Sequence, residues 1–185
     1  MEQFPIMKNL FAVLLISMAS SVAAVCPNNV LIEKALDQNY EKLKSAKLQS
    51  EAQTIVGELW ELWTKAPNDK AQQLLNSGMA RMRQGDLRKA EAELTKLINY
   101  CPNYSEGYNQ RAFTRYLAFD FENALPDLIR ALELRPRHLG ALSGKGLTHK
   151  AMGQELEAEI EFRKALSLNP FTPERNMIPN VGVDL

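Results

Sequence analysis

Small and large apolar residues recur along this chain at a fixed interval of 34 residues. Four positions of this register each hold one kind of residue: small (Gly78, Ala112, Gly146), alanine (Ala90, Ala124, Ala158), large apolar (Leu94, Leu128, Phe162) and proline (Pro102, Pro136, Pro170). A period of this length is typical of stacked helical units, because one unit alone cannot bury both of its apolar faces. The pattern predicts three units, 71–104, 105–138 and 139–172, each with a helix, a turn and a second helix.

Turn and end residues agree with this division. Gly85 and Gly153 fall between the two helices of their units, where glycine reaches a positive φ angle easily. Asp86 and Asp120 follow the turn and are expected to cap the second helix by accepting its free N–H groups. The prolines end each second helix, since the residue before a proline is pushed out of the helical region. The small residue of the first helix and the alanine of the second are expected to face each other.

In these positions the chain resembles the tetratricopeptide repeat (TPR) family, over residues 71–172. The resemblance implies an all-α TPR solenoid of three repeats. Two residues depart from the family pattern, because Phe119 replaces the turn glycine and Leu97 replaces an alanine. Two passages, 108–115 and 136–144, are similar to small exported TPR proteins of proteobacteria.

The second repeat is the least regular of the three. Arg111 and Arg115 stand where apolar or aromatic residues usually pack against the neighbouring helix. A partly buried arginine needs a partner, and Asp120 or Asp127 is the expected carboxylate. Pro126 lies inside the second helix of this repeat and is expected to bend or loosen that turn.

Residues 25–70 precede the repeats, and their apolar spacing predicts a helical hairpin. Apolar residues spaced by three and four indicate one helix over 28–49 and a second over 50–65, with Ser50 as its N-cap. The hairpin is expected to stack on the first repeat as a cap. Trp60 and Trp63 lie on the apolar face of the second helix, where buried packing is favoured over a ligand site.

Residues 1–24 are typical of a secretory signal peptide. Lys8 precedes an apolar run over 10–18, and small residues follow, so cleavage is expected after Ala23 or Ala24. The alternative is an uncleaved membrane anchor, for which the apolar run is short. A lipoprotein is disfavoured, because Val25 stands directly before Cys26 where a small residue is required. The sequence therefore predicts a periplasmic or secreted bacterial protein.

Export changes the interpretation of the two cysteines, Cys26 and Cys101. Disulfides persist in oxidising compartments, so a bridge between them is expected. It would join the N-terminal segment to the end of the first repeat. The alternative is two unpaired thiols.

Composition, charge and the placement of titratable residues disfavour several classes of function. The 22 basic and 22 acidic residues balance, which disfavours a nucleic-acid-binding role. His138 and His149 have no carboxylate or cysteine at metal-ligand spacing, so no metal site and no cofactor are expected. Residues 140–146 resemble a phosphate loop only faintly, with the wrong glycine spacing. No coherent acid–base set is visible, and the sequence does not predict an enzyme.

The TPR resemblance implies a concave groove lined by the first helix of each repeat. Carried onto this chain, the groove positions and two residues at the end of the second repeat are Leu75, Met79, Met82, Arg83, Asn109, Phe113, Tyr116, Leu117, Arg137, His138, Ser143, Leu147 and Lys150. Most are apolar, and methionine and tyrosine adapt well to varied partners. Leu75 and Met79 stand where the family's carboxylate clamp for acidic chaperone tails would begin, so that ligand is disfavoured.

These observations predict a non-catalytic protein–protein interaction module in the bacterial envelope, binding a peptide or protein of unknown identity. One alternative is a self-associating structural protein, with a homodimer formed through the C-terminal end. A less favoured one is an accessory subunit of an envelope enzyme. The tail, 173–185, either folds back over the third repeat or leaves that repeat open for a partner.

Overall fold

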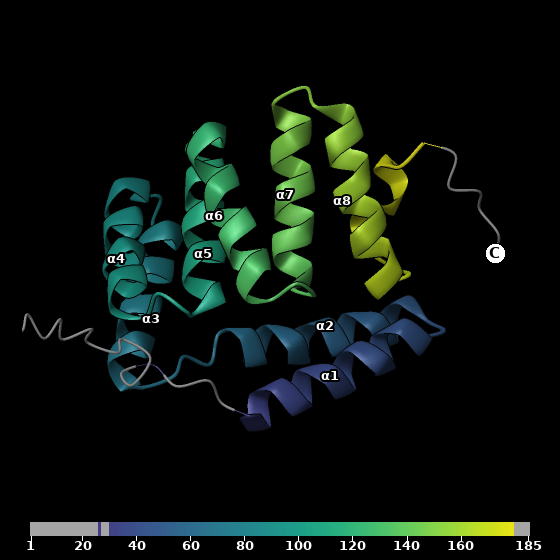
Figure 1. Ribbon diagram of the computed structural model, residues 1–185, viewed down its shortest axis with the longest axis horizontal. Helices are drawn as coiled ribbons and strands as arrows, with labels where there is room; N and C mark the ends of the chain where they lie inside the picture. Colours follow the sequence, from purple (N-terminus) through teal and green to yellow (C-terminus); the bar gives the residue numbers. More distant parts are fainter. Residues whose placement is uncertain (1–25, 27–29, 180–185) are drawn as a thin grey trace, which may run out of the picture.

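The computed structural model describes Cys26 and residues 30–179 (Figure 1). The predicted signal peptide and residues 180–185 lie outside the described residues, as do residues 27–29. The described part is helical throughout its regular elements, which confirms the all-α prediction. None of its helices is long and apolar enough to cross a membrane.

Three helix pairs stand side by side and form the predicted repeats (Figure 1). Their helices are α3 (Asp69–Arg83), α4 (Leu87–Tyr100), α5 (Ser105–Leu117), α6 (Phe121–Leu134), α7 (Leu139–Ala151) and α8 (Glu155–Leu168). Asn68 caps α3 by accepting a hydrogen bond from the Ala71 N–H at 3.0 Å, and Asp86 caps α4. Asp120 precedes α6 without capping it, since its side chain accepts from Asn123 instead.

Small residues in the first helices allow the two helices of a repeat to approach closely. A Cβ atom added to Gly78 would lie 2.6 Å from the Cγ of Leu94. Gly146 meets the ring of Phe162 in the same way. The large apolar residue of the second helix therefore leaves no room for a side chain at this position of the first helix.

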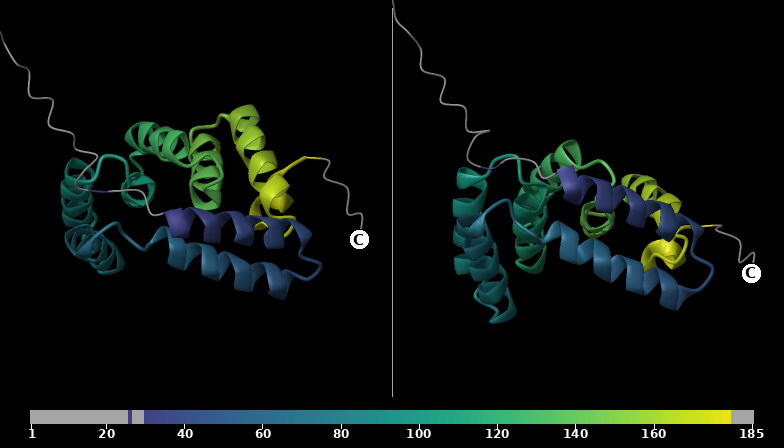
Figure 2. Two further views of the ribbon diagram at one scale, coloured as in Figure 1. Left: turned by 60° about the horizontal axis from the view of Figure 1, so that its bottom comes forward. Right: turned by 90° about the horizontal axis from the view of Figure 1, so that it is seen from below.

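The N-terminal hairpin forms, as α1 (Val30–Ser45) and α2 (Gln49–Trp63), but not on the first repeat. It runs across the ends of the later repeat helices, below them in Figure 1 and in front of them in the view from below in Figure 2. Its apolar residues, among them Leu43 and Leu59, share one core with Leu139 and Leu142 of α7 and Ala165 of α8.

The predicted cap on the first repeat is therefore wrong. The reason is that the edge made by α7 and the end of α8 carries apolar residues that the hairpin covers. Leu48 precedes α2 without a side-chain hydrogen bond, so the expected N-cap at Ser50 is also wrong.

A disulfide joins Cys26 to Cys101, with their Cα atoms 5.6 Å apart. Both cysteines are buried in a cluster with Leu75 and Leu97 of the first repeat. The bridge forms as predicted and fixes the chain before α1 to the end of α4. The hairpin is thus held at one end by the first repeat while it packs on the third.

The tail folds back over the third repeat. A 3₁₀ helix, η2 (Pro173–Met177), follows α8, and Ile178 is buried against Ala158 and Phe162 (Figure 1). Of the two alternatives for the tail, the structure has the first over the described residues. Leu156 and Ile160 on α8 nevertheless stay exposed.

The arginines of the second repeat are paired across its helices. Arg111 Nη2 lies 2.7 Å from Asp127 Oδ1, and Arg115 reaches Asp127 at 2.9 Å and Glu91 at 2.7 Å. The hydrogen-bonded Asp127 carboxylate raises the pKa of Arg111. Asp127 is the partner that the sequence required. Pro126, one residue before it, lies inside α6 without ending the helix.

A second buried carboxylate lies in the third repeat. Glu161 on α8 accepts hydrogen bonds from Lys145 and Lys164, each at 3.0 Å. Burial favours the protonated form, but the two lysines outweigh it, so the pKa of Glu161 lies below its usual value.

Candidate binding groove between the first helices

A cavity of about 220 Å³ opens between α5 and α7, the first helices of the second and third repeats. We call this cavity the groove. Its lining includes Trp60, Asn109, Phe113, Tyr116, Gly140 and Leu147. Apolar and aromatic side chains thus surround it, and α2 of the N-terminal hairpin contributes one wall.

Four of the predicted groove residues line this cavity, namely Asn109, Phe113, Tyr116 and Leu147. Phe113 is 48% exposed although it is a large apolar side chain. An exposed aromatic residue beside an apolar cavity is typical of a binding site and not of a folding core.

Two predicted groove residues, Leu75 and His138, lie inside the protein instead. Leu75 is fully buried between the helices of the first repeat, and Met79 packs partly against the same cluster. His138 is also fully buried. The predictions for Leu75 and His138 are wrong, because helix packing covers Leu75 and the hairpin covers His138.

The remaining predicted residues lie around the groove or away from it. Met82 accepts a hydrogen bond from the Thr114 hydroxyl at 3.5 Å, and Ser143 is half-buried on α7. Arg137 turns to α1, where it pairs with Asp37 and stacks 4.8 Å from the ring of Tyr40.

Two cations and an apolar residue lie at the ends of the first helices. Arg83 and Leu117 are exposed at the last turns of α3 and α5. Lys150, near the end of α7, reaches Glu155 at 3.2 Å and stays partly exposed. Arg83 forms no ion pair within the described part of the chain.

A network of buried polar groups lies at the base of the groove. The Glu106 carboxylate accepts hydrogen bonds from Gln110 Nε2 at 2.5 Å and from Asn109 Nδ2 at 3.3 Å. It also lies 2.7 Å from His138 Nε2. The other ring nitrogen of His138 accepts from the Ala141 N–H at 3.3 Å, so the Nε2–H donates to the carboxylate. Glu106 and Asn109 are therefore held in place.

The network reaches the hairpin through an aromatic stack. The rings of His138 and Trp63 lie 4.3 Å apart at 21°. The Tyr104 hydroxyl donates to the Trp63 carbonyl at 2.7 Å, and burial raises the pKa of Tyr104. These contacts fix the end of α2, and with it the wall of the groove that Trp60 forms.

Trp60 is the groove residue that sequence reasoning placed wrongly. Both tryptophans lie on α2, but Trp63 is buried while Trp60 is 41% exposed and lines the groove. The apolar stripe of α2 does not separate these two roles, because the separation depends on where the hairpin lies.

One groove residue keeps an unused acceptor. Gln110 is 2% exposed, and its Oε1 has no hydrogen-bond partner among the described residues. Its Nε2 is bound to Glu106, which fixes which end of the amide is free. A buried acceptor without a donor is unfavourable, so a donor on a bound molecule would be stabilised there.

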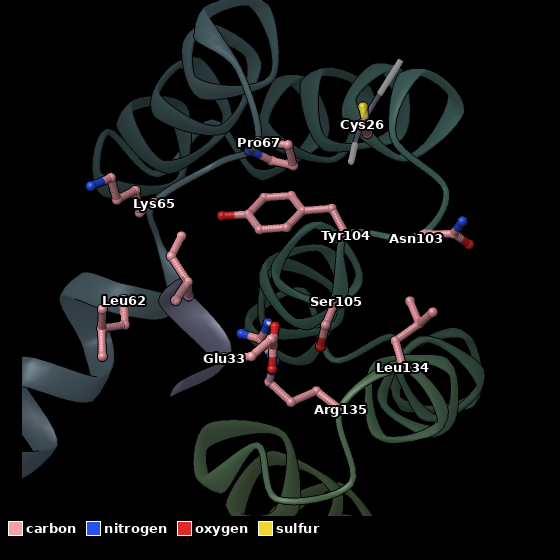
Figure 3. A pocket seen from close by; sticks show the side chains of 11 residues that line it. Cys26, Glu33, Leu62, Lys65, Pro67, Asn103, Tyr104, Ser105, Leu134 and Arg135 are labelled. Atoms are coloured by element: carbon pink, nitrogen blue, oxygen red, sulfur yellow. Dashed lines mark hydrogen bonds and ion pairs between the residues drawn. The ribbon is translucent and has the colours of Figure 1, made fainter. Parts of the chain in front are cut away.

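A second cavity, of about 390 Å³, lies between the hairpin and the junction of the first two repeats (Figure 3). Tyr104, Lys65 and Arg135 line it, and Arg135 pairs with Glu33 at 2.5 Å. The figure shows lining side chains from the hairpin, Glu33 and Leu62, and from the repeats, Ser105 and Leu134. Its charged groups are either paired or exposed, and no nucleophile with an adjacent base is among them.

Comparisons with known proteins agree with the repeats. A sequence model of the family described as "Tetratricopeptide repeat" matches residues 139–172, which is the third predicted unit. Residues 139–172 are a tetratricopeptide repeat, and the chain resembles this family over all three units. Among the described residues, no group of three or more His, Cys, Asp or Glu side chains is placed to hold a metal ion.

Two relatives and one solved structure resemble this chain over most of their own length. A TPR repeat-containing protein of Rhizobium etli is 24% identical over 157 residues, which are 80% of this chain and 77% of that protein. Tetratricopeptide repeat protein 36 of Bos taurus is 28% identical over 163 residues, 83% of this chain and 86% of its own. The first TPR of Spaghetti (RPAP3), solved with an HSP90 peptide, is 25% identical and superimposes with a TM-score of 0.57 over 58% of this chain and 86% of its own.

Proposed function

We propose that this TPR protein is a non-catalytic interaction module that holds a peptide segment of a partner protein in the groove. The observation that carries the proposal is the open apolar cavity beside the half-exposed Phe113. Burial of an apolar side chain there would contribute about 1.5–3 kcal/mol. TPR domains are protein–protein interaction modules, and the Spaghetti domain was solved with a peptide bound.

The chemistry of the groove indicates what the segment carries. Phe113, Tyr116 and Leu147 favour a large apolar side chain. The free Oε1 of Gln110 favours one with a hydrogen-bond donor, such as tyrosine or tryptophan. Because Leu75 is buried and Met79 is apolar, the first repeat does not offer the lysine and asparagine with which a carboxylate clamp begins.

We further propose that the protein works outside the cytoplasm, in the bacterial envelope. The signal-peptide pattern over 1–24 and the Cys26–Cys101 disulfide both support export. Mass spectrometry of the protein from fractionated cells tests this. A mature chain beginning at Ala24 or Val25 in the periplasmic fraction is expected, and an intact N-terminus in the cytosol would reject the location.

Site-specific photo-crosslinking tests the binding site. The photoreactive residue p-benzoyl-phenylalanine is placed at Phe113 and, as a matched control, at Ile129 on α6, which is 42% exposed. We expect crosslinked partner bands from position 113 and not from position 129. Equal bands from both positions, or bands from 129 alone, would show that the groove is not the binding surface.

Self-association is a second candidate, favoured by the outer face of the third repeat. Leu156 and Ile160 lie one helical turn apart on α8 and are 75% and 53% exposed. They place two exposed apolar side chains on one face of the last repeat helix. Light scattering of the wild type and of Leu156→Glu distinguishes this candidate, since a dimer that becomes a monomer in the variant would support it.

A further inference from the structure

The turn between α5 and α6 contains a backbone outlier. Phe119 has φ = 59°, and among the described residues no other non-glycine residue has a positive φ. Gly85 and Gly153 occupy the same register position in the other two repeats, with φ of 76° and 74°. The three turns therefore adopt one conformation, and only in the second does a bulky side chain adopt it.

The fold alone does not explain the strained backbone conformation of Phe119. The left-handed region is unfavourable for a residue with a Cβ atom, and a large side chain there is a genuine outlier. Phe119 is also 80% exposed, so its ring gains little from burial in this chain. Glycine serves the turn better in both sister repeats. A strained conformation that the fold does not need points to function.

The ring of Phe119 continues the apolar surface of the groove. It lies 6.1 Å from the ring of Phe121 in an edge-on arrangement, and Phe121 lies 5.4 Å from Tyr116. Tyr116 lines the groove, and Leu117 beside it is 39% exposed. Aromatic and apolar side chains thus run without a gap from the cavity to the tip of the turn.

Two cations lie at the outer end of the groove. Arg83 and Lys150 stand in the last turns of α3 and α7, and Lys150 pairs with Glu155. Arg83 occupies in the first repeat the register position that Leu117 occupies in the second. A partner lying over this end of the groove would therefore be stabilised by an acidic side chain.

We propose that Phe119 is a second anchor for the bound segment, which rests on the function proposed above. The segment carries two large apolar residues and an acidic residue next to the outer one. The inner apolar residue enters the groove beside Phe113, and the outer one packs on the exposed ring of Phe119. The acidic residue meets Arg83. A single apolar residue would satisfy the groove but would leave the strained phenylalanine without a role.

Selection from a phage-displayed library of random peptides tests the proposal. Peptides are selected on the disulfide-bonded wild-type protein, and their affinities are then measured by fluorescence polarisation. The variants are Phe119→Gly, Phe113→Ala and the control Ile129→Ala. We expect selected peptides to share two apolar positions and an acidic one. Phe119→Gly should weaken them about tenfold, as expected when one partly buried aromatic contact is removed.

Phe119→Gly is a clean variant because the two sister turns already contain glycine. Its melting temperature should not fall, which separates weaker binding from weaker folding. Phe119→Asn, whose side chain tolerates a positive φ, serves as a second variant and should weaken binding to the same extent.

The outcomes separate this inference from the proposed function. Peptides that lose binding in Phe113→Ala but keep full affinity for Phe119→Gly would overturn the second anchor and leave the groove in place. If no peptide depends on Phe113, both proposals fail. If peptide affinities are unchanged but wild-type protein binds vesicles of phosphatidylethanolamine and phosphatidylglycerol through Phe119, the turn is a membrane contact and the inference is wrong.

Discussion

Removing the imidazole of His138 should destabilise the whole protein, because it leaves a buried carboxylate with fewer donors. Glu106 is 1% exposed and His138 is fully buried. The carboxylate is held by the imidazole at 2.7 Å and by the amides of Asn109 and Gln110. In His138→Ala the two amides remain, but water cannot replace the missing donor without opening the core.

The magnitude follows from the two interactions that the imidazole makes. Breaking a buried charged interaction on one side costs about 3–5 kcal/mol. The stack of His138 on Trp63 contributes about 0.5–1.5 kcal/mol more. Glu106→Gln keeps the shape and an acceptor for the imidazole, so it should cost only about 1 kcal/mol. The double variant no longer buries a charge, and we expect a coupling energy of about 2 kcal/mol between the two sites.

Urea denaturation followed by circular dichroism gives these values for the wild type, both single variants and the double variant. All four proteins must keep the disulfide, so the experiment is run without reductant. His138→Ala should be the least stable of the four. If the double variant is less stable than His138→Ala by the full cost of Glu106→Gln, the sites are independent and the reasoning is refuted.

Three further predictions concern the repeats and the bridge. Gly78→Ala should lower the free energy of unfolding by about 1–3 kcal/mol, because the added Cβ would press on Leu94. The control is Gly57→Ala, whose added Cβ would meet no atom within 4 Å. In thermal melts it should raise the free energy of unfolding by about 0.5–1 kcal/mol. The low pKa of Glu161 stabilises the fold above the carboxyl's usual pKa, and this contribution is lost as pH falls through the folded value. Wild type should therefore lose more stability than Glu161→Gln between about pH 6 and pH 3, and parallel urea curves would contradict this. Replacing both cysteines by alanine should cost about 4 kcal/mol for a loop of 75 residues, and an unchanged urea midpoint would show that the bridge does not constrain the unfolded chain.

The repeats could be predicted because their information is local and periodic. Gly85 and Gly153 mark turns, and the 34-residue register places each helix within a few residues. Phe119 and Arg111 are irregular in the sequence alone, because their residue types differ from those expected at these positions of the register. Apolar spacing also predicted the helices of the hairpin.

The position of the hairpin could not be predicted, because it depends on contacts between residues about a hundred positions apart. The apolar spacing of Leu43 and Leu59 indicates that they are buried, but it does not indicate which repeats cover them. The errors at Trp60 and His138 have this one cause. Once α2 lies beside α7, it covers His138 with Trp63 and turns Trp60 into the groove.

The central claim is that the groove holds a peptide, and the two tryptophans of the chain allow a direct measurement. The indole N–H signals of Trp60 and Trp63 are followed by NMR while a peptide selected on the wild-type protein is added. Trp60 lines the groove and Trp63 is buried beside His138, so one reports binding and the other serves as an internal control. The account predicts that the Trp60 signal shifts in proportion to occupancy while the Trp63 signal stays within a small fraction of that shift. A bound peptide that leaves Trp60 unchanged, or moves both signals equally, would contradict it.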